Sequence, residues 1–255
     1  MSTTTRPTVY APRTASCRPT MRFAVQPILD LRTGRIPAVE LLARPSSGGS
    51  VADWSTEELA LASRGLARDA LDVARELPID GGLIHVNITA IDLEDETFST
   101  EVLRRFPDRI DHLVLELTEH FELRDRPTVA ANLHRLRTAG VRFALDDFGD
   151  GWSTMSALRA LRPEILKVNL GSLRGTHGID RNVATWVRNR AHVARCRRVV
   201  VEHLDSLEAV EEALGAGFRY GQGFVLDRYL AKQAGAPVGT TAVIEIDAPI
   251  DLRAA

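Results

Sequence analysis

The sequence predicts an α/β protein that folds as a single (β/α)8, TIM-like barrel with an antiparallel first strand. Apolar segments of strand length alternate with helical segments over most of the 255 residues, which is typical of a barrel built from βα units. A turn too short to hold a helix joins the first two apolar segments, so these two strands should pair antiparallel. An open, doubly wound sheet is the main alternative, although no Gly-x-Gly-x-x-Gly pattern follows the first strand.

Turn residues and helix signals separate the predicted elements. Strands are expected at residues 23–29, 36–42, 83–88, 112–117, 141–145, 164–168, 198–202 and 218–225. Helices are expected at residues 55–76, 100–106, 127–139, 153–161, 179–194 and 206–216. The sequence STEE, from Ser55 to Glu58, is a capping box that opens the first helix, and Gly140 suits the C-terminal cap of the third.

The two ends of the chain differ in composition from the middle. Residues 1–21 are rich in Thr, Pro and Arg and contain no acidic residue, which predicts a disordered arm before a barrel domain over residues 22–231. Residues 232–255 form a predicted tail, in which residues 242–246 are the candidate for an additional edge strand.

Charge and cysteine content limit the partners and the compartment. A net charge of -2 gives no electrostatic reason to expect duplex nucleic acid or an anionic membrane as partner. No apolar run approaches the roughly 20 residues that span a bilayer. Cys17 and Cys196 form neither a disulfide framework nor a metal-binding spacing, and residues 1–21 lack the apolar core of a secretory signal. These features predict a cytoplasmic protein.

Polar residues stand near the carboxyl ends of all the predicted strands except the first. They are Glu40, Asn87, Glu116, Asp146 with Asp147, Lys167, Glu202 and Gln222. Each alone has an ordinary explanation, such as a solvated strand end, an ion pair or, for Asp147, the cap of the next helix. In a barrel, however, all these ends meet at one face. Five carboxylates on one rim would destabilise each other unless cations lay between them.

The residue types indicate which cation. The candidates are hard oxygen ligands without His or Cys, which favours Mg²⁺ or Mn²⁺ over zinc. The adjacent Asp146 and Asp147 can bridge two ions, an arrangement used for in-line phosphoryl displacement. Of the 32 basic residues only Lys167 and Lys232 are lysines. A compact ammonium suits a water or a phosphate oxygen, and the alternative for Lys167 is a buried ion pair with a neighbouring acid.

Seven ordered motifs give the chain a family resemblance over residues 22–231. They are QPILDLRTGRIPAVELLAR (26–44, with Glu40-Leu-Leu42), VNIT (86–89), LELTE (115–119), DDFGDGWS (146–153), LKVN (166–169), VVVEHLD (199–205) and YGQGF (220–224). With these motifs the chain resembles the EAL-domain phosphodiesterases of cyclic di-GMP.

The resemblance implies an EAL-type barrel, two divalent cations (Mg²⁺ or Mn²⁺), a homodimer and hydrolysis of cyclic di-GMP to linear pGpG. By family role, the first cation would be bound by Glu40, Asn87, Glu116 and Asp146, and the second by Asp146 and Asp147. Lys167 and Glu202 would position and activate the attacking water, and Gln222 would orient near the water or the phosphate. Gln26 and Arg44 resemble substrate contacts. Glu119 and the loop residues Phe148, Asp150 and Trp152 resemble the family element that couples metal binding to dimer contacts.

The sequence also departs from the family pattern without losing an implied metal ligand. The usual Glu-Gly-Val-Glu is Glu202-His203-Leu204-Asp205, and the usual Lys-Ile-Asp ends in Asn169. Asp150, Trp152 and Leu41 replace the usual Thr, Tyr and Ala. These departures motivate an alternative: a catalytically weak or inactive EAL domain that acts as a cyclic di-GMP receptor or a protein-interaction module. An unrelated metal-dependent barrel enzyme would share the carboxylates but would not explain Gln26 and Arg44.

Overall fold

A computed structural model describes residues 21–45, 51, 54–77, 81–120, 122–176 and 178–233. The predicted arm, apart from Met21, lies outside the described residues. So do the tail beyond Gln233 and its candidate edge strand at residues 242–246, and these assignments stay predictions. No helix in the described ranges is both long and apolar enough to cross a membrane.

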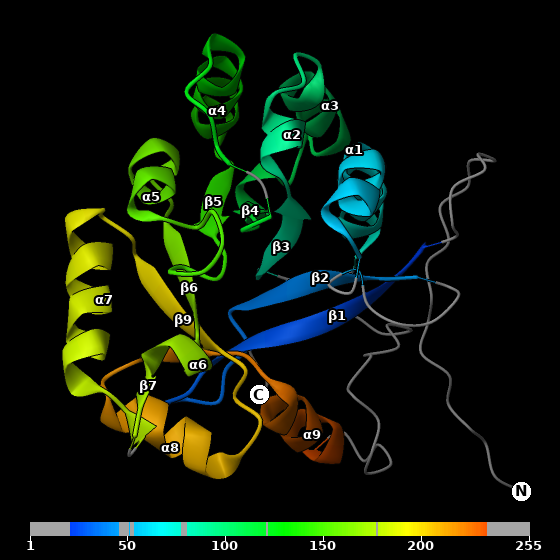
Figure 1. The fold of residues 1–255 in the computed structure, drawn as a ribbon. Coiled ribbons are helices and arrows are strands. Elements are labelled where there is room, and N and C mark those ends of the chain that lie inside the picture. Colours follow the sequence, from blue (N-terminus) through cyan, green and yellow to red (C-terminus); the bar gives the residue numbers. More distant parts are fainter. Residues whose placement is uncertain are drawn as a thin grey trace, which may run out of the picture.

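Among the described residues, eight strands close into a barrel in the order β1-β10-β9-β6-β5-β4-β3-β2 (Figure 1). Strand β1 pairs antiparallel with both β2 and β10, while the other neighbouring strands pair in parallel. The barrel with an antiparallel first strand is therefore confirmed, and the open doubly wound sheet is excluded. The barrel strands are β1 (Met21–Asp30), β2 (Ala38–Pro45), β3 (Leu83–Ile88), β4 (Leu113–Leu117), β5 (Arg142–Leu145), β6 (Ile165–Asn169), β9 (Arg198–Glu202) and β10 (Tyr220–Gly221).

Helices surround the barrel and cover its outer face (Figure 1). They are α1 (Thr56–Glu76), α2 (Ala90–Leu93), α3 (Phe98–Arg105), α4 (Pro127–Ala139), α5 (Met155–Leu161), α6 (Leu170–Leu173), α7 (Arg181–Val193), α8 (Leu207–Gly215) and α9 (Phe224–Gln233), with the 3₁₀ turn η2 (Ile110–His112). Both predicted caps are confirmed. The Ser55 side chain accepts from the Glu58 N–H, and the Glu58 side chain returns to the Ser55 backbone. Gly140 ends α4 with a left-handed φ of 106°.

The predicted last strand, residues 218–225, is wrong in extent. Strand β10 covers only Tyr220–Gly221, and α9 begins at Phe224. A Cβ on Gly223 would overlap the backbone of Leu204, so the chain comes very close to that segment at this point. The Leu226 and Asp227 N–H groups then bond to the Gly223 carbonyl and start the helix. The short helices α2 and α6 and the hairpin β7–β8 (Arg174–Gly175, Gly178–Ile179) were not predicted from the sequence.

The barrel interior is built in layers. One layer is an apolar cluster to which each barrel strand contributes one residue: Ile28, Ala38, Leu83, Val114, Ala144, Ile165, Val200 and Tyr220. Side chains two positions apart in a strand lie on the same face. Two positions toward the carboxyl end in each case, or toward the amino end in the reversed β1, a polar residue lies in the strand or, for β5 and β10, directly after it: Gln26, Glu40, His85, Glu116, Asp146, Lys167, Glu202 and Gln222. Strand alternation thus places a polar layer directly above an apolar one.

Candidate functional site

A pocket opens above the polar layer. One wall is apolar and comes from β1 and from α1, including Phe23, Leu59, Leu66 and Ala70. The other wall is polar and contains nearly all the predicted site residues: Gln26, Arg44, Glu40, Asn87, Glu119, Asp146, Asp147, Lys167, Glu202 and Gln222. The remaining predicted ligand, Glu116, is fully buried beneath this wall. The structure therefore brings ten of these side chains to one pocket, with Glu116 buried next to it, while the roles assigned to them stay predictions.

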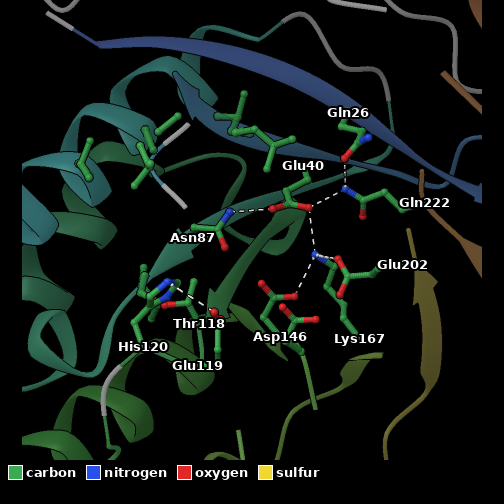
Figure 2. A pocket seen from close by; sticks show the side chains of 18 of the residues that line it. Gln26, Glu40, Asn87, Thr118, Glu119, His120, Asp146, Lys167, Glu202 and Gln222 are labelled. Atoms are coloured by element: carbon green, nitrogen blue, oxygen red, sulfur yellow. Dashed lines mark hydrogen bonds and ion pairs between the residues drawn. The ribbon is translucent and has the colours of Figure 1, made fainter. Parts of the chain in front are cut away.

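The Lys167 ammonium lies at the centre of the polar layer (Figure 2). Its Nζ atom is 2.9 Å from Glu40 Oε2, 2.7 Å from Glu202 Oε1 and 3.2 Å from Asp146 Oδ1. It also pairs with Glu116 Oε1. Burial alone would lower the pKa of Lys167, but the surrounding carboxylates raise it well above its usual value. Lys167 therefore forms the buried ion pairs that were one of its two predicted roles. Its role toward a water or a phosphate stays a prediction.

Glu40 is the most completely bonded carboxylate of the site. Its Oε1 accepts from Asn87 Nδ2 at 2.7 Å, and its Oε2 accepts from Gln222 Nε2 at 2.6 Å and from Lys167. Burial alone would raise the pKa of Glu40, but the Lys167 charge and these donors lower it to about 2. Glu40 is therefore an anion across the physiological pH range.

Glu116 is held by a residue that the sequence did not single out. His85 Nδ1 lies 2.7 Å from Glu116 Oε2, and both side chains are buried. Burial, and then the Lys167 charge, lower the pKa of His85 to about 3, so the imidazole is neutral and its Nδ1–H can donate. Burial, and then Glu40, raise the pKa of Glu116 well above its usual range. Position 85 lies two residues before Asn87, so both side chains lie on the same face of β3. This spacing could have identified His85 as a neighbour of the site from the sequence.

The surroundings of Asp147 bring its pKa close to neutral pH. Burial, and then the neighbouring Asp146, raise the pKa of Asp147 to about 6, while burial, and then Asp146, also raise the pKa of Glu202. Asp147 has a left-handed φ of 42°, and Thr154 rather than Asp147 caps α5. The capping explanation for Asp147 is therefore wrong.

The donor chemistry of the site fits divalent cations. Within the described part of the chain, the buried oxygens Asp147 Oδ1, Glu202 Oε2 and Gln222 Oε1 accept no hydrogen bond, and Asp146 Oδ1 has only the Lys167 ammonium at 3.2 Å. Five carboxylates gather here and four of them pair with the one ammonium of Lys167, so acidic groups outnumber the lysine. In the same described ranges, no three His, Cys, Asp or Glu side chains surround a common metal position as they stand. Four of these carboxylates converge on the Lys167 ammonium, so they surround that ammonium and not a metal position.

The two predicted substrate contacts differ in their surroundings. Arg44 lines the pocket, and its Nη1 donates to the Ala43 carbonyl at 3.0 Å. Gln26 is held on two sides: its Nε2 donates to Asp227 Oδ2 at 2.8 Å, and its Oε1 accepts from Gln222 at 2.7 Å. Asp227 is a second residue that sequence reasoning missed.

The predicted coupling loop packs against Glu119. The Trp152 N–H donates to the Glu119 carbonyl at 3.0 Å, and a Cβ on Gly151 would lie 2.8 Å from the same oxygen. Phe148 is buried and stacks on Trp186, whereas Trp152 is 51% exposed. Asp150 points elsewhere and accepts from the Ser172 hydroxyl at 3.0 Å.

Two of the departures from the family pattern have identifiable surroundings. Asn169 Oδ1 accepts from the Gly171 N–H at 2.8 Å and caps α6. His203 lines the pocket with a left-handed φ of 59°. Position 203 therefore has the left-handed backbone conformation that favours glycine, although its residue is a bulky histidine.

Comparisons with known proteins agree with this geometry. A family model described as EAL domain matches residues 13–229. The chain is 30% identical over 232 residues to the probable cyclic di-GMP phosphodiesterase PdeB of Escherichia coli, covering 82% of this chain and 42% of that protein. It is also 30% identical over 220 residues to the cyclic di-GMP phosphodiesterase PA2567 of Pseudomonas aeruginosa, covering 79% and 37%. The chain thus spans about two fifths of the length of these curated relatives.

Solved structures of the same fold contain the expected ligands. The calcium and cyclic di-GMP complex of Klebsiella pneumoniae BlrP1 matches with a TM-score of 0.67 at 26% identity, over 86% of this chain and 59% of that one. The manganese and cyclic di-GMP complex of BlrP1 matches with a TM-score of 0.67 at 25% identity, over 86% and 58%. From the match over residues 13–229 and from these relatives, we conclude that the chain belongs to the EAL domain family.

Proposed function

We propose that this chain is a metal-dependent phosphodiesterase that hydrolyses cyclic di-GMP to linear pGpG. One observation carries the proposal. In a chain of the EAL domain family, five acidic side chains from four separate segments meet at the floor and wall of one pocket, and four of them pair with a single buried lysine. Packing this much negative charge together has an energetic cost that a purely structural site would avoid.

The site residues divide into metal ligands and groups that act on the water or the substrate. We assign the first cation to Glu40, Asn87, Glu116 and Asp146, and the second to Asp146 and Asp147. Two divalent cations, Mg²⁺ or Mn²⁺, would neutralise the excess charge and lower the pKa of a water molecule, so that its oxygen can attack phosphorus at neutral pH.

The chain's own groups then handle the protons and the substrate. Glu202 has a free buried oxygen and a raised pKa, which suits a group that takes a proton from the attacking water. Lys167 holds Glu202 in place at 2.7 Å. In the reaction the water oxygen bonds to phosphorus and the bond from phosphorus to the 3′ oxygen breaks. That oxygen takes up a proton, and the product carries a 5′ phosphate and a free 3′ hydroxyl.

Substrate contacts are assigned to the pocket wall. Arg44 is half-buried at the pocket, and its guanidinium can pair with a phosphate of the dinucleotide. Gln222 offers a free oxygen, and Gln26 lies directly behind it.

The test is turnover of cyclic di-GMP by the purified chain with Mg²⁺ or Mn²⁺, followed by chromatography of pGpG. We expect product with either ion, inhibition by Ca²⁺ because of its looser coordination geometry, and loss of at least about 100-fold in Glu40→Gln. Glu211→Gln, a change at an exposed acid on α8, is the matched control and should keep full activity. Intact cyclic di-GMP with both ions would refute the proposal.

A second function is favoured by one observation. His203 places an imidazole on the pocket wall where the resemblance calls for glycine, a residue with no side chain. The alternative is therefore a receptor that binds cyclic di-GMP without hydrolysing it, or an interaction module. Titration calorimetry separates the two, because a receptor gives a binding heat and no product.

Assembly and location are also proposals. The exposed Trp152 on the loop that contacts Glu119 is the apolar surface that we assign to a homodimer contact. Sedimentation of the wild type beside Trp152→Ser tests this assignment, because loss of that contact would shift the species toward monomer. The cytoplasmic location stays a prediction.

A further inference from the structure

Asp227 is a buried carboxylate behind the site, and the proposed chemistry gives it no role. It lies in the first turn of α9, is 1% exposed, and does not line the pocket. Its Oδ2 accepts from Gln26 Nε2 at 2.8 Å, a contact between residues 201 positions apart in the chain. Burying a carboxylate this deeply costs stability unless hydrogen bonds or charges compensate it, so its contact with Gln26 is informative.

A chain of hydrogen bonds connects Asp227 to the polar layer (Figure 2 shows its inner part). Gln26 Oε1 accepts from Gln222 Nε2 at 2.7 Å, and the same nitrogen donates to Glu40 Oε2 at 2.6 Å. The order is therefore Asp227, Gln26, Gln222 and Glu40, with a carboxylate at each end.

The two carboxylates determine how both amides are turned. An ionised carboxylate only accepts hydrogen bonds, so Gln26 must present its Nε2 to Asp227 and its Oε1 to Gln222. Gln222 then meets acceptors on two sides, Gln26 Oε1 and Glu40 Oε2, and both hydrogens of its Nε2 are used. Its Oε1 is left buried and, within the described part of the chain, without a hydrogen-bond partner.

We propose that Asp227 is a positioning residue that holds the Gln26 amide in one orientation and thereby presents the free oxygen of Gln222 to the substrate pocket. The inference rests on the proposed function and deepens it. A neutral amide at position 227 could either accept or donate and would fix the orientation of Gln26 less firmly, and alanine would not fix it at all. Because Asp227 acts through Gln26, its removal should change nothing once Gln26 is gone.

The test is a double-mutant cycle in the full chain, measured as kcat/KM for cyclic di-GMP with Mn²⁺. We expect Asp227→Ala to lower kcat/KM about 10-fold, as for loss of one hydrogen bond to a charged group. Asp227→Asn, which keeps one accepting oxygen, should recover part of this loss. In a Gln26→Ala background, Asp227→Ala should change kcat/KM by less than about 2-fold. Tyr229→Ala, at an exposed residue of α9, is the control and should match the wild type.

The outcomes separate the two proposals. Equal losses from Asp227→Ala with and without Gln26 would overturn the positioning role, because a purely structural effect does not depend on Gln26. If the wild type shows no turnover, the proposed function fails, and the same cycle is then read from calorimetric binding of cyclic di-GMP. Coupled losses of affinity would support the positioning role in a receptor, and a chain that neither binds nor hydrolyses the dinucleotide would overturn both.

Discussion

Replacing Asp227 by Asn should change how the stability of the fold depends on pH. Burial raises the pKa of Asp227 from 3.8 to about 6, with Asp205 adding to the rise and Gln26 and Arg228 opposing it. Between these two values the folded protein keeps a proton that the unfolded chain has lost. Stability therefore falls as pH rises through this window, and the destabilisation is fully present above pH 6.

The magnitude follows from the two pKa values. A rise from 3.8 to about 6 corresponds to about 3 kcal/mol in total, of which about 2 kcal/mol develops between about pH 4.5 and pH 7.5. Asp227→Asn removes this term. The variant should therefore gain about 2 kcal/mol relative to the wild type when the pH is raised across that interval.

Urea denaturation of both proteins at the two pH values measures this difference. Any cost of packing the new amide is present at both values and cancels in the comparison, as do the other titrating groups. A difference in unfolding free energy that is the same at both pH values would refute the assigned burial of the charge.

Three further predictions are read from urea denaturation. Gly223→Ala should destabilise the fold by more than about 3 kcal/mol, because the new Cβ would overlap the Leu204 backbone. The control Gly34→Ala has open space around its Cβ and should cost only about 1 kcal/mol. Similar losses from the two variants would contradict the close approach at Gly223. Ser55→Ala should cost about 1 kcal/mol by removing a capping box, and an unchanged midpoint would show that the cap is dispensable. His85→Leu should cost about 2 kcal/mol because Glu116 loses a buried donor, and a neutral effect would contradict that contact.

Elements with strong local signals were predictable from the sequence. The capping box at Ser55, the glycine cap at Gly140 and the short turn between β1 and β2 all agree with the structure. The start of α9 was missed because the local apolar run Phe224 to Leu226 suits a strand as well as a helix. The close approach of Gly223 to the Leu204 backbone decides between them, and that contact joins separate segments.

The candidate site divides in the same way. The residue types and their places at strand ends were readable, because alternation along a strand forces every second side chain to one face. The contacts of His85 with Glu116 and of Asp227 with Gln26 were not, because they join residues 31 and 201 positions apart.

The amino-acid order was enough to predict which strands carry acids, that the barrel would bring them together, and that oxygen donors dominate the site. The arrangement of the charge became clear only in the folded protein: Lys167 lies among four carboxylates, and the amides of Gln26 and Gln222 are turned by acids at both ends. The physical reason is that hydrogen bonds and ion pairs depend on distances of a few ångströms between atoms, and strand closure rather than local sequence sets those distances.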